Sequence, residues 1–126
     1  MLGNLSPLPM IAVKDLDRAR RFYRDVLGLE ELPGIEGQVA RYRAGTSVFA
    51  VYRSEYAGTN KATVLTWEVE DGGLEEKVEA LRAKGVRFEH YDLPDTRREG
   101  DIHVAGRIRN AWFKDPDGNI HGISSM

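Results

Sequence analysis

The sequence contains no cysteine among its 126 residues. Disulfide bonds, thiolate metal ligands and thiol nucleophiles are therefore all excluded. No apolar stretch approaches the roughly 20 residues that a membrane-spanning helix needs. Residues 1–9 also lack the charged and apolar regions of an export signal. We therefore expect a soluble, cytoplasmic protein with no membrane partner.

A surplus of charge of either sign is also missing. Eighteen lysines and arginines stand against 20 aspartates and glutamates, which gives a net charge of -2. This balance provides no electrostatic reason to expect nucleic acid or an anionic membrane as a partner. The length is that of about one domain, and a hydrophobic content of 41% is ordinary for a globular protein.

The sequence does contain one pattern of elements twice: a strand, an aspartate, an amphipathic helix, a glycine and further strands. In the first half the helix follows Asp15, whose carboxylate can accept hydrogen bonds from the first turn, and it ends at Gly28. In the second half the helix follows Asp71 and ends at Gly85. Apolar residues recur with a period near two in the segments predicted as strands, which are 8–13, 29–32, 39–43, 47–52, 64–69, 86–91, 107–113 and 120–123.

We therefore predict an α+β fold made of two βαβββ modules, which span about residues 5–55 and 61–126 of a single domain, 1–126. The modules are expected to form a curved, cup-shaped, eight-stranded mixed sheet with both helices outside. The polar segment 94–106 has no counterpart in the first half and offers few residues for a core. It is predicted as a long loop, either disordered or functional as a lid.

Four stretches of this pattern resemble motifs of the vicinal oxygen chelate superfamily, which includes glyoxalases, bleomycin resistance proteins and extradiol dioxygenases. They are Ala12–Tyr23, Leu27–Leu29, Trp67–Asp71 and Trp112–Asn119, the last of which reads Trp-Phe-Lys-Asp-Pro-Asp-Gly-Asn. The resemblance implies an open cup built from paired modules, usually within a homodimer, and a small molecule bound inside the cup.

The metal-dependent members of this superfamily carry histidine, glutamine or glutamate at four positions, in the first and the last strand of each module. These positions fall on Leu8, Ala50, Val64 and Gly122. None of the four side chains can ligate a divalent metal, so we expect no metal and no cofactor there. His121 adjoins one position and could enter the cup through a β-bulge, but a strand histidine hydrogen-bonded to backbone or an exposed polar group is the favoured interpretation.

Side chains alternate between the two faces of a strand, and this alternation predicts a ligand-binding surface. The candidates are Met10, Ala50, Tyr52, Thr66, Glu68, Trp112 and Gly122, together with His103 from the segment 94–106. Trp67 projects to the helix side instead. The predicted surface is mainly apolar, which favours a largely apolar small organic molecule held by few hydrogen bonds.

Glu68 is the strongest candidate for chemistry, because a carboxylate on an apolar wall is hard to ionise and can act as a general base. His103 and Arg98 could instead close over an anionic ligand. The catalytic residues are otherwise unknown.

Three functions follow from this pattern. The leading hypothesis is a metal-independent protein that binds a small organic molecule, resembling the bleomycin-resistance branch. The alternative is a metal-independent lyase, isomerase or hydrolase with Glu68 or His103 as acid or base. A metal-dependent glyoxalase- or dioxygenase-type enzyme comes third, because it needs ligands that the sequence does not supply. Binding tolerates Glu68→Gln, whereas general-base chemistry does not.

Overall fold

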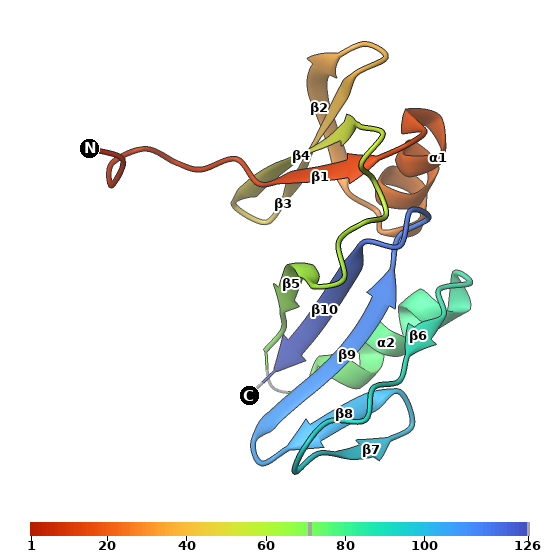
Figure 1. Cartoon of the computed structure of the whole chain (residues 1–126). Coiled ribbons are helices and arrows are strands. Elements are labelled where there is room, and N and C mark those ends of the chain that lie inside the picture. Colours follow the sequence, from red (N-terminus) through yellow and green to blue (C-terminus); the bar gives the residue numbers. More distant parts are fainter. Residues whose placement is uncertain (71, 126) are drawn as a thin grey trace. The chain divides into compact units, whose positions relative to one another are not determined.

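The computed structural model describes residues 1–70 and 72–125. The chain divides into two compact units, one up to Thr59 and the other from Asn60 onward, and each unit has its own sheet and helix (Figure 1). The mixed α+β fold class is therefore confirmed. Asp71, which was expected to precede the second helix, lies outside the described residues.

The first unit holds a four-stranded sheet. Its elements are β1 (Met10–Val13), α1 (Leu16–Arg20), the π-helical segment η1 (Arg21–Val26), β2 (Glu30–Ile35), β3 (Val39–Ala44) and β4 (Ser47–Arg53). The strand order is β1-β4-β3-β2, and β1 runs parallel to β4. Oδ1 of Asp15 accepts from the amides of Asp17 and Arg18 at 2.9 and 3.2 Å, while Gly28 has a φ of 74°. The predicted cap residues of the first helix are therefore confirmed.

One face of this sheet is covered by three buried aromatic rings. The centroid of Tyr23 lies 5.7 Å from that of Tyr42 and 5.8 Å from that of Phe49. Burial raises the pKa of Tyr42 to about 12. Ile11 and Val13 point to the same buried face, as the alternation predicted, so this core forms between α1, η1 and the sheet.

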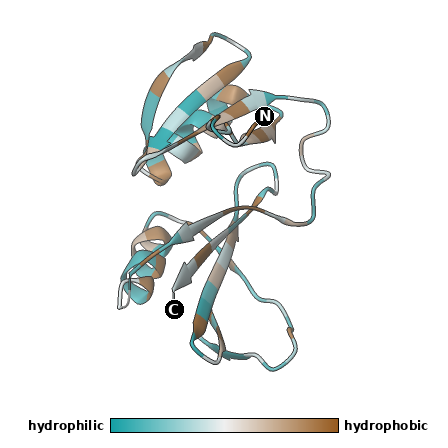
Figure 2. Cartoon of the chain, turned by 90° about the vertical axis from the view of Figure 1, so that its left-hand side faces the viewer, coloured by the Kyte–Doolittle hydropathy of each residue, from teal (hydrophilic) through white to brown (hydrophobic). Residues whose placement is uncertain are grey.

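The second unit holds a six-stranded sheet. Its elements are β5 (Thr63–Glu68), α2 (Leu74–Ala83), β6 (Phe88–Glu89), β7 (Arg97–Glu99), β8 (Ile102–Ala105), β9 (Ile108–Lys114) and β10 (Ile120–Ser125). The strand order is β5-β10-β9-β8-β7, with β6 paired to β9. Brown and teal segments alternate along the strands, as Figure 2 shows, which is the pattern of sheets with one buried face. No helix in the described part of the chain is both long and apolar enough to cross a membrane.

The segment 94–106 corrects one prediction, because it is not a loop but contains the hairpin β7–β8. Arg98 pairs with His103, and Glu99 pairs with Ile102. Gly100, with a φ of 63°, provides the left-handed turn. The charged residues of β7 concealed this hairpin, whereas Ile102 and Val104 on β8 are buried. The eight predicted strand segments are thus joined by two more, and the strands form sheets of four and six.

His121 belongs to the core of the second unit. Its side chain is 0% exposed, and its ring is stacked on Phe113 with the centroids 5.0 Å apart. Nε1 of Trp67 donates to Nδ1 of His121 at 3.1 Å. A register irregularity separates Ile120 from His121, but it leaves His121 beside Trp67 and Phe113. His121 is thus a strand histidine of the core that accepts a hydrogen bond from the Trp67 side chain, whereas the favoured interpretation had a hydrogen bond to backbone or an exposed group.

Burial makes His121 a source of acid sensitivity. It lowers the pKa of this histidine from its ordinary 6.5 to about 4, so the unfolded chain binds one more proton than the folded chain between these values. The stabilising contribution of the neutral ring is complete above pH 6.5 and is lost as the pH falls to about 4, by about 3 kcal/mol.

We therefore expect His121→Asn, which keeps an acceptor near Trp67, to lose about 3 kcal/mol less unfolding free energy than the unchanged protein between pH 7 and 4. Urea unfolding at each pH measures the difference. Parallel stability curves for the two proteins would contradict the assignment.

Candidate functional site

One face of the second sheet brings five predicted site residues together. Thr66 stands opposite Gly122, and Gly122 stands opposite Trp112. In the next row Glu68, Ser124, Asn110 and His103 follow one another across four strands. Directly opposite residues project to the same side of a sheet, so both rows lie on one surface, which we call the Trp112 face. His121 and Trp67 lie on the other side.

Gly122 is the closest point of the first row. A Cβ built on this glycine would lie 3.2 Å from Nε1 of Trp112 and 3.4 Å from Oγ1 of Thr66. The indole edge and the hydroxyl therefore occupy the space into which a larger side chain at position 122 would extend. Any such side chain would require the indole to shift by a few tenths of an ångström.

Beside this row lies a cluster of rings that the sequence analysis recognised only in part. His103 is 2% exposed, and its centroid lies 4.9 Å from that of Trp112, nearly perpendicular to it. Tyr91 contacts both, with centroid distances of 5.4 Å to Trp112 and 6.2 Å to His103. His90 lies 6.3 Å from His103. We call His90, Tyr91, His103 and Trp112 the His103 cluster.

A backbone hydrogen bond determines the tautomer of the buried imidazole of His103. The amide of Tyr91 donates to Nε2 of His103 at 2.9 Å, so a neutral ring carries its proton on Nδ1. That Nδ1 and the Tyr91 hydroxyl are buried, and neither has a hydrogen-bond partner among the residues that the structure describes. Burial also raises the pKa of Tyr91. Unpaired buried polar atoms each cost about 1–3 kcal/mol, so they mark a place that a ligand group can satisfy.

The outer edge of the cluster is held by charges. Nε2 of His90 lies 2.7 Å from Oδ1 of Asp101, and Arg82 on α2 binds the other oxygen of that carboxylate. Arg82, and then His90, hold the pKa of Asp101 below its usual range. Neither His90 nor Tyr91 is among the site residues predicted from the sequence. The only available signal was two aromatic residues at the end of a strand.

A pocket of about 340 Å³ opens at this cluster. Its walls are His90, Tyr91, Asp92, Thr96, Arg97, Arg98 and His103. A volume above about 300 Å³ is in the range of small-molecule sites. The segment 94–106, expected to be either a disordered loop or a lid, thus supplies part of the pocket wall, including residues of β7 and β8.

The expected apolar wall around Glu68 is not observed. Glu68 is exposed, and the residues that follow in its row are Ser124, Asn110 and His103. Its neighbours are therefore polar.

The remaining predicted residues, Met10, Ala50 and Tyr52, lie on the first sheet. Met10 stands opposite Ala50, while Tyr52 stands opposite Ala12 on β1. Ala50 is buried and Met10 is 50% exposed, and both point away from the aromatic core of that unit. These three residues share one face, as predicted.

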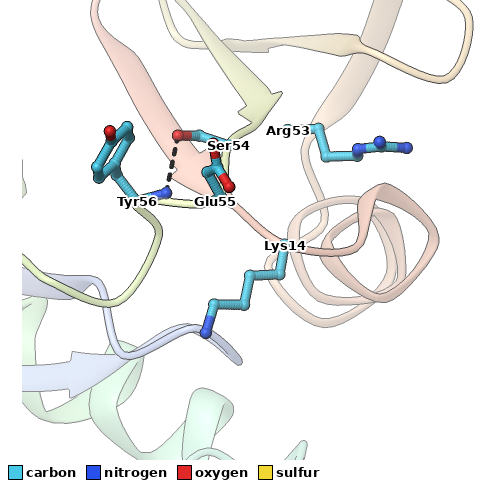
Figure 3. Close-up of a pocket in the computed structure, with 5 residues that line it drawn as sticks. All are labelled: Lys14, Arg53, Ser54, Glu55 and Tyr56. Atoms are coloured by element: carbon cyan, nitrogen blue, oxygen red, sulfur yellow. Dashed lines mark hydrogen bonds between the residues drawn. The ribbon is translucent and has the colours of Figure 1, made fainter.

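A second hollow, of about 890 Å³, is lined by Lys14, Arg53, Ser54, Glu55 and Tyr56. Figure 3 shows the side chains of Lys14, Arg53 and Tyr56 extending in different directions, while the Tyr56 amide donates to Oγ of Ser54. The hydroxyl of Ser54 thus caps a local turn. Two residues of the first pocket, Tyr91 and His103, have buried polar atoms without a hydrogen-bond partner in the described part of the chain. None of the five described residues that line this wide, polar hollow has such an atom.

The four positions predicted as equivalent to metal ligands do not supply side-chain donors for a divalent metal. Gly122, Ala50, Val64 and Leu8 offer no donor atoms, and Nε1 of Trp112, the atom nearest to Gly122, is a donor without a lone pair for a metal. Among residues 1–70 and 72–125 no group of three histidines, aspartates or glutamates is placed to hold a metal ion. The side chains of the Trp112 face do not fit a metal centre.

Two βαβ-type units with these motifs define a class of paired-module α+β proteins. A model of the Glyoxalase/Bleomycin resistance protein/Dioxygenase superfamily matches residues 7–121. The chain belongs to this superfamily, as the resemblance implied. A search of curated proteins finds no match.

Solved structures share the fold. A lactoylglutathione lyase from Agrobacterium tumefaciens superposes with a TM-score of 0.71 at 19% identity, over 98% of this chain and 95% of that one. The fosfomycin resistance protein FosX from Mesorhizobium loti gives 0.69 at 16% identity, over 100% and 94%. A mutant FosX from Listeria monocytogenes, complexed with Mn(II) and 1S,2S-dihydroxypropylphosphonic acid, gives a TM-score of 0.69 at 17% identity, over 98% of this chain and 90% of that one. At such identities the similarity shows the fold alone.

The hydrogen bond to His103 can be tested directly. We expect His103→Phe, which removes the acceptor, to speed hydrogen exchange of the Tyr91 amide about tenfold, because the N–H loses its partner. His103→Gln can place an amide oxygen near the former Nε2 and is expected to preserve most of the protection. Equal exchange rates in the two variants, measured by NMR, would contradict this role.

Proposed function

We propose that this chain binds a small organic molecule on the Trp112 face, without a divalent metal at the position of Gly122. The observation that carries the proposal is the packing at Gly122, where the Trp112 indole and the Thr66 hydroxyl take up the space of a metal-ligating side chain. The site then offers a flat aromatic surface rather than a Lewis acid.

The chemistry of the face supports a ligand with both apolar and polar parts. The Trp112 indole is partly exposed and provides a surface on which an apolar or aromatic group can pack. Thr66, Asn110 and the His103 cluster provide hydrogen-bonding groups around it. Such a mixture of aromatic surface with few polar groups is typical of small-molecule sites. We therefore propose an amphipathic ligand, in place of the largely apolar one that the sequence analysis expected.

The names of the structural relatives agree with a small ligand. One relative is a lyase of lactoylglutathione, and another is complexed with a dihydroxypropylphosphonic acid and Mn(II). We take from them only the size of the ligand, since residues 1–70 and 72–125 of this chain hold no group of three acidic or histidine side chains placed to bind a metal. The homodimer and the cytoplasmic location expected from the sequence stay predictions.

Acid–base catalysis on the same face is the second candidate. The observation in its favour is the row that carries Glu68 and His103 on one surface, with Ser124 and Asn110 between them. A carboxylate and a neutral imidazole are the usual proton-transfer groups of enzymes. Glu68→Gln distinguishes the candidates, because it leaves binding intact and removes a base.

Metal binding gives the first test. We expect purified protein, saturated with Mn²⁺, Ni²⁺, Zn²⁺ or Fe²⁺ and then dialysed, to retain far less than one equivalent of metal, because no set of donors converges. Elemental mass spectrometry measures the content, with FosX from Listeria monocytogenes as the positive control for Mn²⁺. One retained equivalent per chain would contradict the proposal.

Ligand binding gives the second test. Trp67→Phe leaves Trp112 as the single tryptophan of the chain, so its fluorescence reports the Trp112 face. We expect compounds from a library of small amphipathic organic molecules to change this fluorescence and to raise the melting temperature.

Trp112→Ala is expected to abolish the thermal shift by these compounds. Tyr56→Ala, in the second hollow, is the matched control and is expected to leave the shift unchanged. Compounds whose effect depends on Tyr56 rather than Trp112, or a library without any active compound, would contradict the proposal.

A further inference from the structure

We infer that the pocket beside the His103 cluster receives the carboxylate of an organic acid, with Arg98 as its main charged contact. The inference rests on the proposed ligand site of the Trp112 face and names the chemical class of its ligand. Two independent features carry it, an uncommitted guanidinium and two orphaned polar atoms.

Arg98 is placed directly against the buried histidine. It stands opposite His103 in the β7–β8 hairpin, and such pairs have Cβ atoms about 4.5–5.5 Å apart on the same side of the sheet. Within the described ranges the Arg98 side chain has no ion pair or hydrogen bond. Its neighbour Arg97 differs, because Nη2 of Arg97 is 3.0 Å from Oε2 of Glu99. The pocket therefore has one guanidinium that is available and one that already has a carboxylate partner.

The two orphaned atoms belong to Tyr91 and His103, which line the same pocket as Arg98, and each can donate a hydrogen bond to a ligand oxygen. The Nδ1–H of His103 can only donate, and the Tyr91 hydroxyl can donate as well. Both atoms are buried, and both rings contact Trp112. A ligand oxygen reaches them only if the covering side chains move slightly, so binding must also change the surroundings of the Trp112 indole.

The guanidinium of Arg98 can hold one negative charge of a ligand. Asp92 is the one acidic residue among the seven that line the pocket, and no ion pair joins it to Arg98 in the part of the chain that is described. Because Arg97 is paired with Glu99, Arg98 is the arginine of this pocket whose guanidinium is left for a ligand anion, and Asp92 opposes that anion. The planar fork of a guanidinium matches a carboxylate in a bidentate manner, and Trp112 provides an adjacent surface for an aromatic ring.

Benzoate and its neutral analogue benzamide test the inference on the complete chain. Each is titrated into ¹⁵N-labelled protein, and the amide shifts of Arg98 and His103 and the indole Nε1–H shift of Trp112 are followed. We expect saturable shifts at all three with benzoate, and binding of benzamide that is at least about tenfold weaker, as for loss of a charge-assisted hydrogen bond.

Three charge variants separate a specific contact from a general field. Arg98→Gln is expected to weaken benzoate about tenfold. Arg97→Gln makes the same change of charge in the same pocket, but is expected to alter the dissociation constant by no more than about twofold, because Glu99 already holds that guanidinium. Asp92→Asn removes the opposing carboxylate and is expected to strengthen binding.

The outcomes distinguish failure of the carboxylate inference from failure of the proposed function, which is binding of a small organic molecule on the Trp112 face. Equal shifts of the Trp112 indole by benzoate and benzamide would overturn the proposed recognition of a carboxylate and leave the Trp112 face as a binding site. Equal weakening by the Arg97 and Arg98 variants would overturn the role of Arg98. Shifts by neither probe at Trp112, together with no active compound in the wider library, would overturn both proposals.

Discussion

The hydrogen bond from the Tyr91 amide to Nε2 of His103 is the contact on which the candidate site depends. It ties the segment after β6 to β8, so that the Tyr91 and His103 rings both reach Trp112. It also decides the tautomer, because an Nε2 that accepts leaves the proton on Nδ1. The orphaned donor is thus a consequence of a satisfied acceptor. The second unit keeps this buried imidazole at a cost that a ligand oxygen can remove.

The two buried histidines show how position in a sheet divides one residue type into two roles. His121 faces the core, is stacked on Phe113, and accepts from Trp67. Its lowered pKa follows from burial alone, so it contributes to stability and to acid sensitivity. His103 lies on the opposite face with an unsatisfied nitrogen beside a pocket. A single residue of difference in register would exchange the two faces.

The sequence predicted the paired modules and the faces of their strands because both rest on short-range periodicity. Ile11 and Val13 inside, and Thr66 and Trp112 together on one surface, follow from a period of two. The prediction of a loop over 94–106 was wrong because Ile102 and Val104 are the only buried apolar residues of its strands, and the strand before them, β7, is charged. His90 and Tyr91 contact Asp101, His103 and Trp112, which lie on other strands or turns. No local sequence pattern could therefore predict these contacts. Such long-range contacts are set by sheet order, which alternation does not encode.

The chemistry open to this chain depends on what replaces a ligand at Gly122. A glycine alone would leave a gap, but here the Trp112 indole and the Thr66 hydroxyl lie within 3.4 Å of its missing Cβ. Restoring a carboxylate there would require the indole to move, and the indole is itself held by Tyr91 and His103. The aromatic packing of the site and the absence of donors at position 122 are therefore coupled. A substitution of Gly122 by glutamate would therefore disturb the contacts that Trp112 makes within the His103 cluster.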